Sequence, residues 1–417
     1  MAKEKIITGI DIGSTKISTL VAALNENKIS VIGVSKVPSS GVNKGNVNDI
    51  DEAVEAISNS LERAERMAGV SVSSALVTVN GSHVQTLNSH GVVAVSHSGA
   101  EINASDVGRV TEAAQAIQLP TSQELIHTIP RDFIVDSQNG IKDPVGMSGI
   151  RLEVETNIIH GSSTAMKNLA KCVSQVGVDV EGMVYVGVAS AAATLTDTEM
   201  ELGTILVDIG GGTTSIIIFL DGSPIFSSVL PIGGKHITSD LAIGLRAHME
   251  TAEKIKIRLS EERLSYATLE NKNFLNEEID LAEYGLESQK IPRRFLYEIM
   301  DARLEEIFKF IELEIKKANL LGKLPAGIVV TGGSSQTAGI EKVAKGVLRM
   351  PVRVGYPKGV TGLIDEIEGP AYAAAVGTLI YSSKMIKSNS MLSFDNQKGN
   401  IGEILSKFFD KAKSFLP

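Results

Sequence analysis

Two glycine-rich stretches decide the fold of this chain: GIDIGSTK at residues 9–16 and LVDIGGGTTS at residues 206–215. In each stretch, apolar and β-branched residues precede an aspartate and follow the glycines, which indicates a strand, a tight turn and a second strand. Either stretch alone predicts no more than a hairpin. Because the pattern recurs in corresponding places of the two halves of the chain, we expect two related α/β domains that face each other.

A third glycine turn follows another predicted strand. Residues 327–331 are apolar and β-branched, Gly332 and Gly333 turn the chain, and residues 338–348 have helical periodicity. In this order of strand, turn and helix, loop amides and the helix N-terminus attract phosphate or ribose oxygens. Helical periodicity is also strong in three longer segments, residues 51–68, 106–117 and 293–321.

The composition is that of a globular protein in a reducing compartment. The 417 residues are 43% hydrophobic and 21% charged, enough for about two to three domains of roughly 150 residues. A net charge of −9 lacks the basic surplus that nucleic-acid binding requires, so we expect no such partner. The single cysteine, Cys172, excludes an intramolecular disulfide framework and is expected to be structural. Without a secretory leader or an apolar run of ~18 residues, we expect a cytosolic protein with only peripheral membrane contact.

The C-terminal segment differs in composition from the rest of the chain. Residues 382–400 are rich in Ser, Lys, Asn and Gln, which predicts a flexible linker. Residues 401–417 carry a helical apolar stripe with lysines beside it, which predicts an amphipathic helix on an anionic membrane surface. The stripe and its lysines are Ile401, Ile404, Leu405, Phe408, Phe409, Phe415, Leu416, Lys407 and Lys411. A terminal helix docked on the protein's own core is the alternative, which the linker disfavours.

The glycine turns favour nucleotide chemistry when all three are taken together. Glycines let backbone N–H groups approach anionic oxygens, because no β-carbon intervenes. Asp11 and Asp208 each end a predicted strand, and such carboxylates hold Mg²⁺ through its water shell. The chain has neither a P-loop nor a strand-linked dinucleotide fingerprint, and its seven histidines form no recognisable metal or catalytic motif.

Four motifs resemble those of the actin, Hsp70 and sugar-kinase superfamily. GIDIGSTK and LVDIGGGTTS match its phosphate motifs, VVTGGSS at residues 329–335 its adenosine motif, and EGPAYAAAVG at residues 368–377 its second connecting motif. AEKIKIRLS at residues 252–260 is similar to the Hsp70 segment that contacts ribose and adenine. The resemblance implies an actin-like ATPase fold of two related α/β domains, with ATP and Mg²⁺ in the cleft between them. The cofactor-binding residues that it implies are Gly13, Ser14, Thr15, Lys16, Gly210, Gly211, Gly212, Thr213, Thr214, Gly233, Gly234, Glu253, Lys256, Ser260, Gly332, Gly333 and Ser334.

Within this superfamily, GIKDPVGMSGIRLE at residues 140–153 and the preceding LIHTIPRDFIVDSQN resemble the FtsA family of bacterial cell-division proteins. That family carries an inserted subdomain, 1C, where actin has subdomain 1B. The division of the chain that follows is 1–81, 165–190 and 365–381 for subdomain 1A, 82–164 for 1C, 191–250 and 320–364 for 2A, 251–319 for 2B, 382–400 for the linker and 401–417 for the membrane-targeting helix.

The resemblance implies a polymerising, ATP-binding protein that tethers FtsZ filaments of the Z ring to the cytoplasmic face of the cell membrane at the septum. The implied partners are the C-terminal peptide of FtsZ, further copies of the chain, an anionic membrane surface and, through subdomain 1C, later division proteins. The ARLEEI segment at residues 302–307 matches the family's partner-contacting helix, so Arg303 and Glu306 are candidates for the FtsZ contact, although a solvated helix face explains them as well.

Two departures from the family pattern bear on catalysis. Ser215 stands where an aspartate usually follows GGGTT, and the adenosine motif reads TGGSS rather than TGGGA. Both leave ATP binding plausible and predict weak or no ATPase activity, with no catalytic residue identified. A small-metabolite kinase of the same superfamily is the alternative, but it requires a general base that the sequence does not identify. An Hsp70-like chaperone is disfavoured because too few residues follow the last motif, and a rod-shape homologue because the amphipathic segment lies at the C-terminus.

Overall fold

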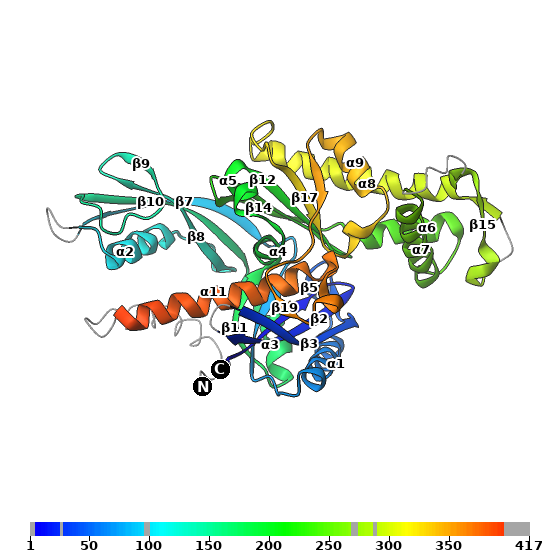
Figure 1. The fold of residues 1–417 in the computed structure, drawn as a ribbon, viewed down its shortest axis with the longest axis horizontal. Coiled ribbons are helices and arrows are strands. Elements are labelled where there is room, and N and C mark those ends of the chain that lie inside the picture. Colours follow the sequence, from blue (N-terminus) through cyan, green and yellow to red (C-terminus); the bar gives the residue numbers. More distant parts are fainter. Residues whose placement is uncertain (1–4, 26–27, 96–100, 268–273, 287–289, 396–417) are drawn as a thin grey trace.

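The computed structural model describes residues 5–25, 28–95, 101–267, 274–286 and 290–395. Two sheet-centred domains lie one above the other in Figure 1, with a small lobe projecting from each on opposite sides. Within the described residues, no helix is long and apolar enough to cross a lipid bilayer.

The first domain is built on a six-stranded sheet of order β11-β6-β1-β2-β3-β19. A meander of three antiparallel strands is joined by parallel strands on its outer sides. The strands are β1 (Lys5–Ile12), β2 (Lys16–Asn25), β3 (Lys28–Pro38), β6 (Ser74–Val79), β11 (Asp179–Tyr185) and β19 (Thr361–Gly362). The second domain repeats this plan in a five-stranded sheet of order β14-β13-β12-β17-β18. Its strands are β12 (Thr204–Ile209), β13 (Thr214–Leu220), β14 (Ser223–Leu230), β17 (Gly327–Thr331) and β18 (Val352–Val354).

The shared plan confirms the two related α/β domains that the repeated glycine turns predict. In both sheets, the first strand pairs with its hairpin partner on one side and with a parallel strand on the other. The aspartate of each motif lies near the end of that first strand, and the glycine turn follows it directly.

Helices cover both faces of the first sheet, which is why β1 and β2 are apolar almost throughout. Residues Ile10 and Ile17 face α1 (Ile50–Ala68) and α3 (Ser163–Gln175), whereas Ile7 and Leu20 face α4 (Val186–Thr194) and α11 (Ala373–Asp395). Cys172 is buried in the first of these layers, as expected of a structural thiol.

The predicted helices are present with small shifts at their ends. The segment 51–68 forms α1, which begins after the N-cap Asp49 and ends at Gly69 in the left-handed conformation. The segment 106–117 forms α2 (Ala104–Gln115) and 338–348 forms α9 (Ile340–Leu348). The segment 293–321 forms α8 (Arg293–Lys317), which ends four residues early because Asn319 adopts a left-handed conformation with φ of 56°.

The two projecting lobes differ in structure. The lobe on the first domain has a four-stranded sheet of order β7-β10-β8-β9, made of β7 (Gln85–Ala94), β8 (Gln123–Val135), β9 (Gln138–Ile141) and β10 (Arg151–Ser162), with α2 packed on one face. The lobe on the second domain contains α6 (Gly234–Leu245), α7 (Met249–Ala267), part of α8 and the hairpin of β15 (Glu278–Asp280) and β16 (Lys290–Pro292). The remaining elements are β4 (Val42–Asn43), β5 (Asn46–Val47), α5 (Asp197–Leu202), α10 (Ile364–Ile367) and the short 3-10 helices η1 (Phe274–Asn276), η2 (Leu281–Tyr284), η3 (Gly333–Gln336) and η4 (Pro370–Tyr372).

The flexible linker predicted for residues 382–400 is wrong for its first part. Helix α11 continues through Asp395, well past the expected end of the domain. Tertiary contacts explain the difference: Tyr381, Met385 and Ile386 pack against the core of the first domain, and Ser382 and Ser383 are buried. The amphipathic segment 401–417 lies outside the described residues.

Candidate functional site

The three predicted glycine turns meet in one pocket between the two domains. Its wall contains most of the predicted phosphate-binding residues, together with several that the sequence did not suggest. The lining residues are Asp11, Ile12, Gly13, Ser14, Thr15, Lys16, Asn80, Val186, Asp208, Gly210, Gly211, Thr213, Gly332, Gly333, Ala371 and Ala374.

The first two turns are tight and touch each other. The amide of Gly13 donates to Lys16 O at 3.0 Å, and that of Gly210 donates to Thr213 O at 2.9 Å. A β-carbon at position 211 would lie 2.1 Å from Thr15 Cγ2, and one at position 212 would lie 2.9 Å from Ser14 Oγ. Glycine is therefore needed here for the close approach of the two domains.

The carboxylates of Asp11 and Asp208 face this pocket from corresponding strand ends. Asp11 Oδ1 accepts a hydrogen bond from Thr78 Oγ1 at 2.9 Å, and its Oδ2 lies 3.1 Å from Lys16 Nζ. Asp208 Oδ2 accepts a hydrogen bond from Ser190 Oγ at 2.5 Å. Burial raises the pKa of Asp208 to about 6, with the Ser190 hydroxyl opposing the shift and the charge of Asp11 adding to it.

These donors fit Mg²⁺ bound together with a phosphate chain. Mg²⁺ usually takes one or two protein carboxylates and keeps several waters, and within the described residues no three His, Cys, Asp or Glu side chains cluster into a fuller metal cage. Lys16 supplies a positive charge beside the first turn, and the glycines of both turns leave room for backbone amides to approach an anion.

The third turn and the start of α6 pack against the second turn. Ser334 Oγ donates to Gly210 O at 2.9 Å, and the amide of Gly234 donates to the same carbonyl at 2.9 Å. A β-carbon at position 233 would lie 2.5 Å from Gly210 O, and one at Gly332, where φ is 84°, would lie 2.3 Å from Asp208 Oδ1. The second turn, the third turn and the start of α6 therefore form one closely packed unit in the second domain.

The predicted ribose and adenine residues lie together on α7, behind this unit rather than in the pocket wall. Lys256 Nζ lies 2.7 Å from Glu253 Oε2 and donates to Thr238 Oγ1 at 2.9 Å. It also approaches Gly234 O at 3.5 Å, which connects the group to the turn at the start of α6. Ser260 Oγ accepts a hydrogen bond from the amide of Ala338, so this serine joins α7 to the segment after the third turn. Thr214, also predicted, has its side chain buried and bonded to Ile232 O.

Sequence reasoning missed four polar residues around the pocket: Thr78, Asn80, Ser190 and Lys235. Thr78 lies near the end of β6, the strand parallel to β1, and Asn80 follows that strand. Polar residues at the carboxyl end of a parallel strand are a recognisable signal for a site. Ser190 lies inside an apolar, alanine-rich helix, where no local pattern distinguishes it.

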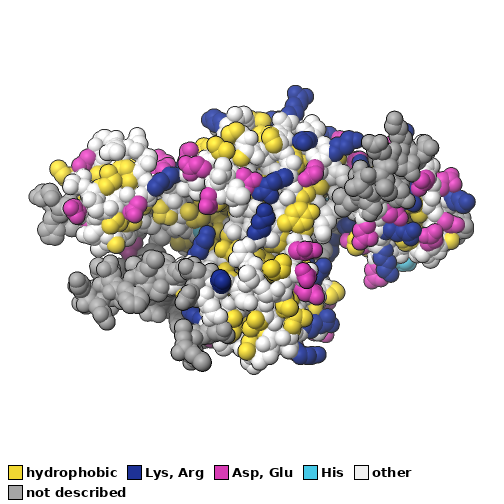
Figure 2. Space-filling view, viewed as in Figure 1, with side chains coloured by type: hydrophobic (Ala, Val, Ile, Leu, Met, Phe, Trp, Pro, Cys, Tyr) yellow, Lys and Arg dark blue, Asp and Glu magenta, His cyan; other side chains and the backbone are white. Residues whose placement is uncertain are grey.

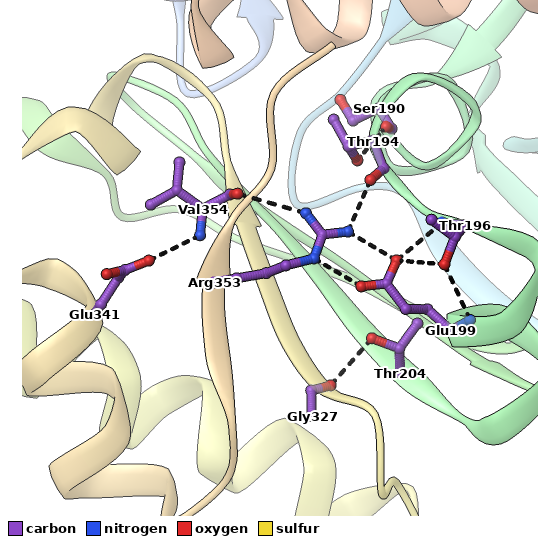
Figure 3. Close-up of polar contacts among 9 residues, drawn as sticks. All are labelled: Ser190, Thr194, Thr196, Glu199, Thr204, Gly327, Glu341, Arg353 and Val354. Carbon is purple, nitrogen blue, oxygen red and sulfur yellow. Dashed lines mark hydrogen bonds and ion pairs between the residues drawn. The ribbon is translucent and has the colours of Figure 1, made fainter. Parts of the chain in front are cut away.

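The helix that carries Ser190 is anchored to the second domain at its C-terminal end (Figure 3). Arg353 Nη2 donates to Thr194 O at 2.9 Å, and the Arg353 guanidinium forms a fork with both oxygens of Glu199 at 2.6 and 2.7 Å. Hydrogen bonding to Arg353 lowers the pKa of Glu199 to about 2. These bonds fix the end of α4 and thereby help to position Ser190 against Asp208.

The two residues predicted to contact a partner lie on α8, away from the pocket. Arg303 forms a fork with Asp240 of α6 at 2.6 and 2.8 Å and also pairs with Glu306. It is therefore not a freely solvated side chain, because it ties α8 to α6. Nearby on α6, Ile243 is 74% exposed. Figure 2 shows side chains of both charges over this lobe.

Comparisons with known protein sequences match this chain to one family over nearly its whole length. The model of the family described as "Cell division protein FtsA" matches residues 205–377, and that described as "SHS2 domain inserted in FTSA" matches residues 81–160. The chain is 37% identical over 413 residues to the cell division protein FtsA of Pseudomonas aeruginosa, covering 97% of both chains. It is 36% identical to the Bacillus subtilis protein, covering 92% of this chain and 85% of the relative, and 32% identical to that of Escherichia coli K12, covering 91% of both.

Solved structures agree on the fold at much lower identity. The "PilM-PilN type IV pilus biogenesis complex" matches with a TM-score of 0.62 and 14% identity, covering 90% of this chain and 98% of that one. MreB5 of Spiroplasma citri bound to ADP matches with a TM-score of 0.53 and 14% identity, covering 92% and 98%. These likenesses support the actin-like ATPase fold.

Proposed function

Because this chain belongs to the FtsA family of cell-division proteins, we propose that it is an ATP-binding, polymerising tether that holds FtsZ filaments at the cytoplasmic face of the cell membrane. The observation that carries the nucleotide part of this proposal is the pocket in which Asp11, Lys16 and Asp208 meet three glycine turns. Asp11 and Asp208 would hold Mg²⁺ through water, and Lys16 would face the phosphates. The bound metal would neutralise phosphate charge.

We propose that the chain hydrolyses ATP slowly or not at all. Position 215 lies directly across the hairpin from Asp208, and it is a serine. Its hydroxyl donates to Asn80 Oδ1 at 2.9 Å, so this side chain offers no general base for a water molecule. Nucleotide binding would then switch the chain between conformations and assembly states, and repeated hydrolysis would not be required.

Membrane attachment is proposed for residues 401–417 on the strength of their sequence. Seven large apolar side chains lie on one helical stripe, and Lys407 and Lys411 lie beside it. Burial of one such side chain contributes roughly 1.5 to 3 kcal/mol, and a lysine near an anionic surface about 1 kcal/mol. Ordering of the segment at about 1 to 2 kcal/mol per residue opposes both terms, so attachment of one molecule should be weak and reversible.

The lobe of α6, α7 and α8 is the proposed site for the C-terminal peptide of FtsZ. Exposed Ile243 offers an apolar contact, and the charged group of Asp240, Arg303 and Glu306 lies beside it. A carboxylate of the peptide would have to compete with Asp240 for the Arg303 fork. We propose that the inserted subdomain contacts later division proteins, as the family resemblance implies.

Liposome co-sedimentation tests the proposal as a whole. The full chain and a version ending at Gly399 are mixed with anionic vesicles, with and without Mg-ATP, together with a fluorescent FtsZ C-terminal peptide. We expect pelleting that requires residues 400–417, increases with Mg-ATP and carries the peptide along. Phe408→Asp in the full chain serves as the matched control, because it removes apolar stripe without shortening the chain, and it should also stay in solution. Equal pelleting of the full and shortened chains would contradict membrane attachment through the tail.

A further inference from the structure

One side chain connects the two domains directly at the pocket. Asn80 follows β6 of the first sheet, and its Nδ2 donates to Thr213 Oγ1 of the second phosphate turn at 3.0 Å. Its Oδ1 accepts a hydrogen bond from Ser215 Oγ of β13 at 2.9 Å. Both acceptor and donor on the second domain are buried, with Thr213 5% and Ser215 1% exposed. Hydrogen bonds to such buried groups are costly to lose without replacement.

The orientation of the Asn80 amide is set by its own backbone. The amide of Gly81 donates to Asn80 Oδ1 at 2.9 Å. A flipped side chain would turn its NH₂ group towards this N–H donor, so the two would repel. The oxygen is therefore held toward Gly81 and Ser215, and the nitrogen toward Thr213.

A second connection between the domains has a different character. Lys235 at the start of α6 donates from Nζ to Ser14 O, in the first phosphate turn, at 2.7 Å. The Lys235 ammonium carries a full charge, so a phosphate chain would compete for it. The Asn80 amide is neutral, so a phosphate chain attracts it less strongly than it attracts Lys235.

We propose that Asn80 is a positioning residue that holds the second phosphate turn against the first and so keeps the cleft closed. The consequence for nucleotide rests on the proposed function: because the same link closes the cleft before nucleotide enters, it slows both entry and release of Mg-ATP. Lys235 contributes to closure through Ser14 O only until phosphate replaces this carbonyl as its partner, whereas Asn80 holds the turns together with and without nucleotide.

Two measurements on Asn80→Ala test this role. The first is hydrogen exchange of the amides in residues 9–16 and 208–214 without nucleotide, and the second is the release rate of a fluorescent ATP analogue with Mg²⁺. We expect both rates to rise on the order of tenfold, because two hydrogen bonds across the cleft are lost. The association rate of the analogue should rise by a similar factor, because nucleotide enters and leaves through the same opening of the cleft. Ser215→Ala should have a smaller effect of about threefold, and adding it to Asn80→Ala should have little further effect, since both remove the same link.

Asn88→Ala is the matched control. Asn88 Nδ2 also reaches the second domain, at 3.4 Å from Ile225 O, but the contact is exposed and lies away from the pocket. This variant should exchange and release as the wild type does. Unchanged exchange in Asn80→Ala, in a protein that melts near the wild-type temperature, would overturn the inference. A wild-type chain that binds no ATP analogue would instead contradict the proposed function, and the exchange rates would still decide the role of Asn80.

Discussion

Asp208 is the residue where burial and the proposed metal chemistry oppose each other. Its carboxylate is buried near Asp11, and its pKa is raised from 3.8 to about 6. The folded chain therefore binds this proton more tightly than the unfolded chain does. The stabilising contribution is complete below about pH 4 and is lost as the pH rises through 6.

Asp208→Asn should consequently stabilise the chain in the absence of Mg²⁺. Above pH 7 we expect the free energy of unfolding to increase by up to about 3 kcal/mol, since one pKa unit corresponds to about 1.4 kcal/mol. The gain should shrink steadily as the pH falls towards 4. Urea unfolding across this pH range measures the effect, and Asp179→Asn, at an exposed position at the start of β11, is the control. A gain that is the same at every pH would show that the charge of Asp208 is not its cause.

The sequence identifies site residues only where they have a local pattern. Asp11, Lys16 and Asp208 are identified because each lies in or beside a glycine turn, and the structure places all three around one pocket. Ser190 has no glycine beside it, and Asn80 precedes a single glycine, Gly81, that matches none of the phosphate motifs. They reach the pocket only because β6 and α4 end or pass beside it, which is a property of the sheet order and not of any short segment.

Among the elements, α4 and α11 cross at close range beside the first sheet. A β-carbon at Gly377 of α11 would lie 1.7 Å from Ala189 O of α4. The carbonyl is part of the helix backbone, so the methyl group cannot be accommodated by a side-chain rotation. The two helices would have to separate, and α4 carries the serine that bonds to Asp208.

Gly377→Ala should therefore destabilise the fold by about 3 kcal/mol or more, at or above the upper end of overpacking. Differential scanning calorimetry measures the loss. Gly108→Ala in α2 provides the contrasting substitution, because a β-carbon there meets nothing within 4 Å. Alanine in that helix should stabilise by about 0.5 to 1 kcal/mol. If Gly377→Ala melted as Gly108→Ala does, the close crossing would not be a constraint.

Helix α11 also shows what composition cannot reveal about an element. Its serines and lysines indicate a linker from residue 382, yet Met385 and Ile386 pack against the core of the first domain. Just before them, Tyr381 packs beside His127 of β8, with their ring centroids 5.5 Å apart. His127 Nε2 accepts a hydrogen bond from the amide of Tyr185, and burial lowers the His127 pKa to about 4. These contacts come from distant parts of the chain, so tertiary packing overrides the local preference.

At the scale of the whole molecule, the repeated glycine turns correctly predict two facing domains, but not where the lobes and the last helix lie. Figure 1 shows α11 passing below the inserted lobe and ending on that side of the molecule. The α6–α8 lobe projects from the opposite side. The described part of α11 thus ends on the side opposite the proposed FtsZ contact, which suits the proposed tether.

Under the proposed function, membrane attachment should depend on assembly. One tail would be a weak anchor, because ordering the segment offsets much of its apolar gain, and the chain's net charge of −9 is repelled by an anionic surface. Copies joined in a filament would present several tails to one vesicle, and avidity would then raise the affinity without any new contact.

We expect binding of the full chain to anionic vesicles to rise more steeply with protein concentration than a single-site isotherm. Residues 396–417 fused to a monomeric carrier should instead bind weakly and hyperbolically. Raising the salt from about 0.05 M to about 0.5 M should weaken binding of the fused segment, because it screens the lysines, and should weaken binding of the full chain less, because it also screens the repulsion of the negatively charged chain. Identical hyperbolic curves for the two proteins would mean that each molecule attaches alone, and assembly would then have no part in holding the tether at the membrane.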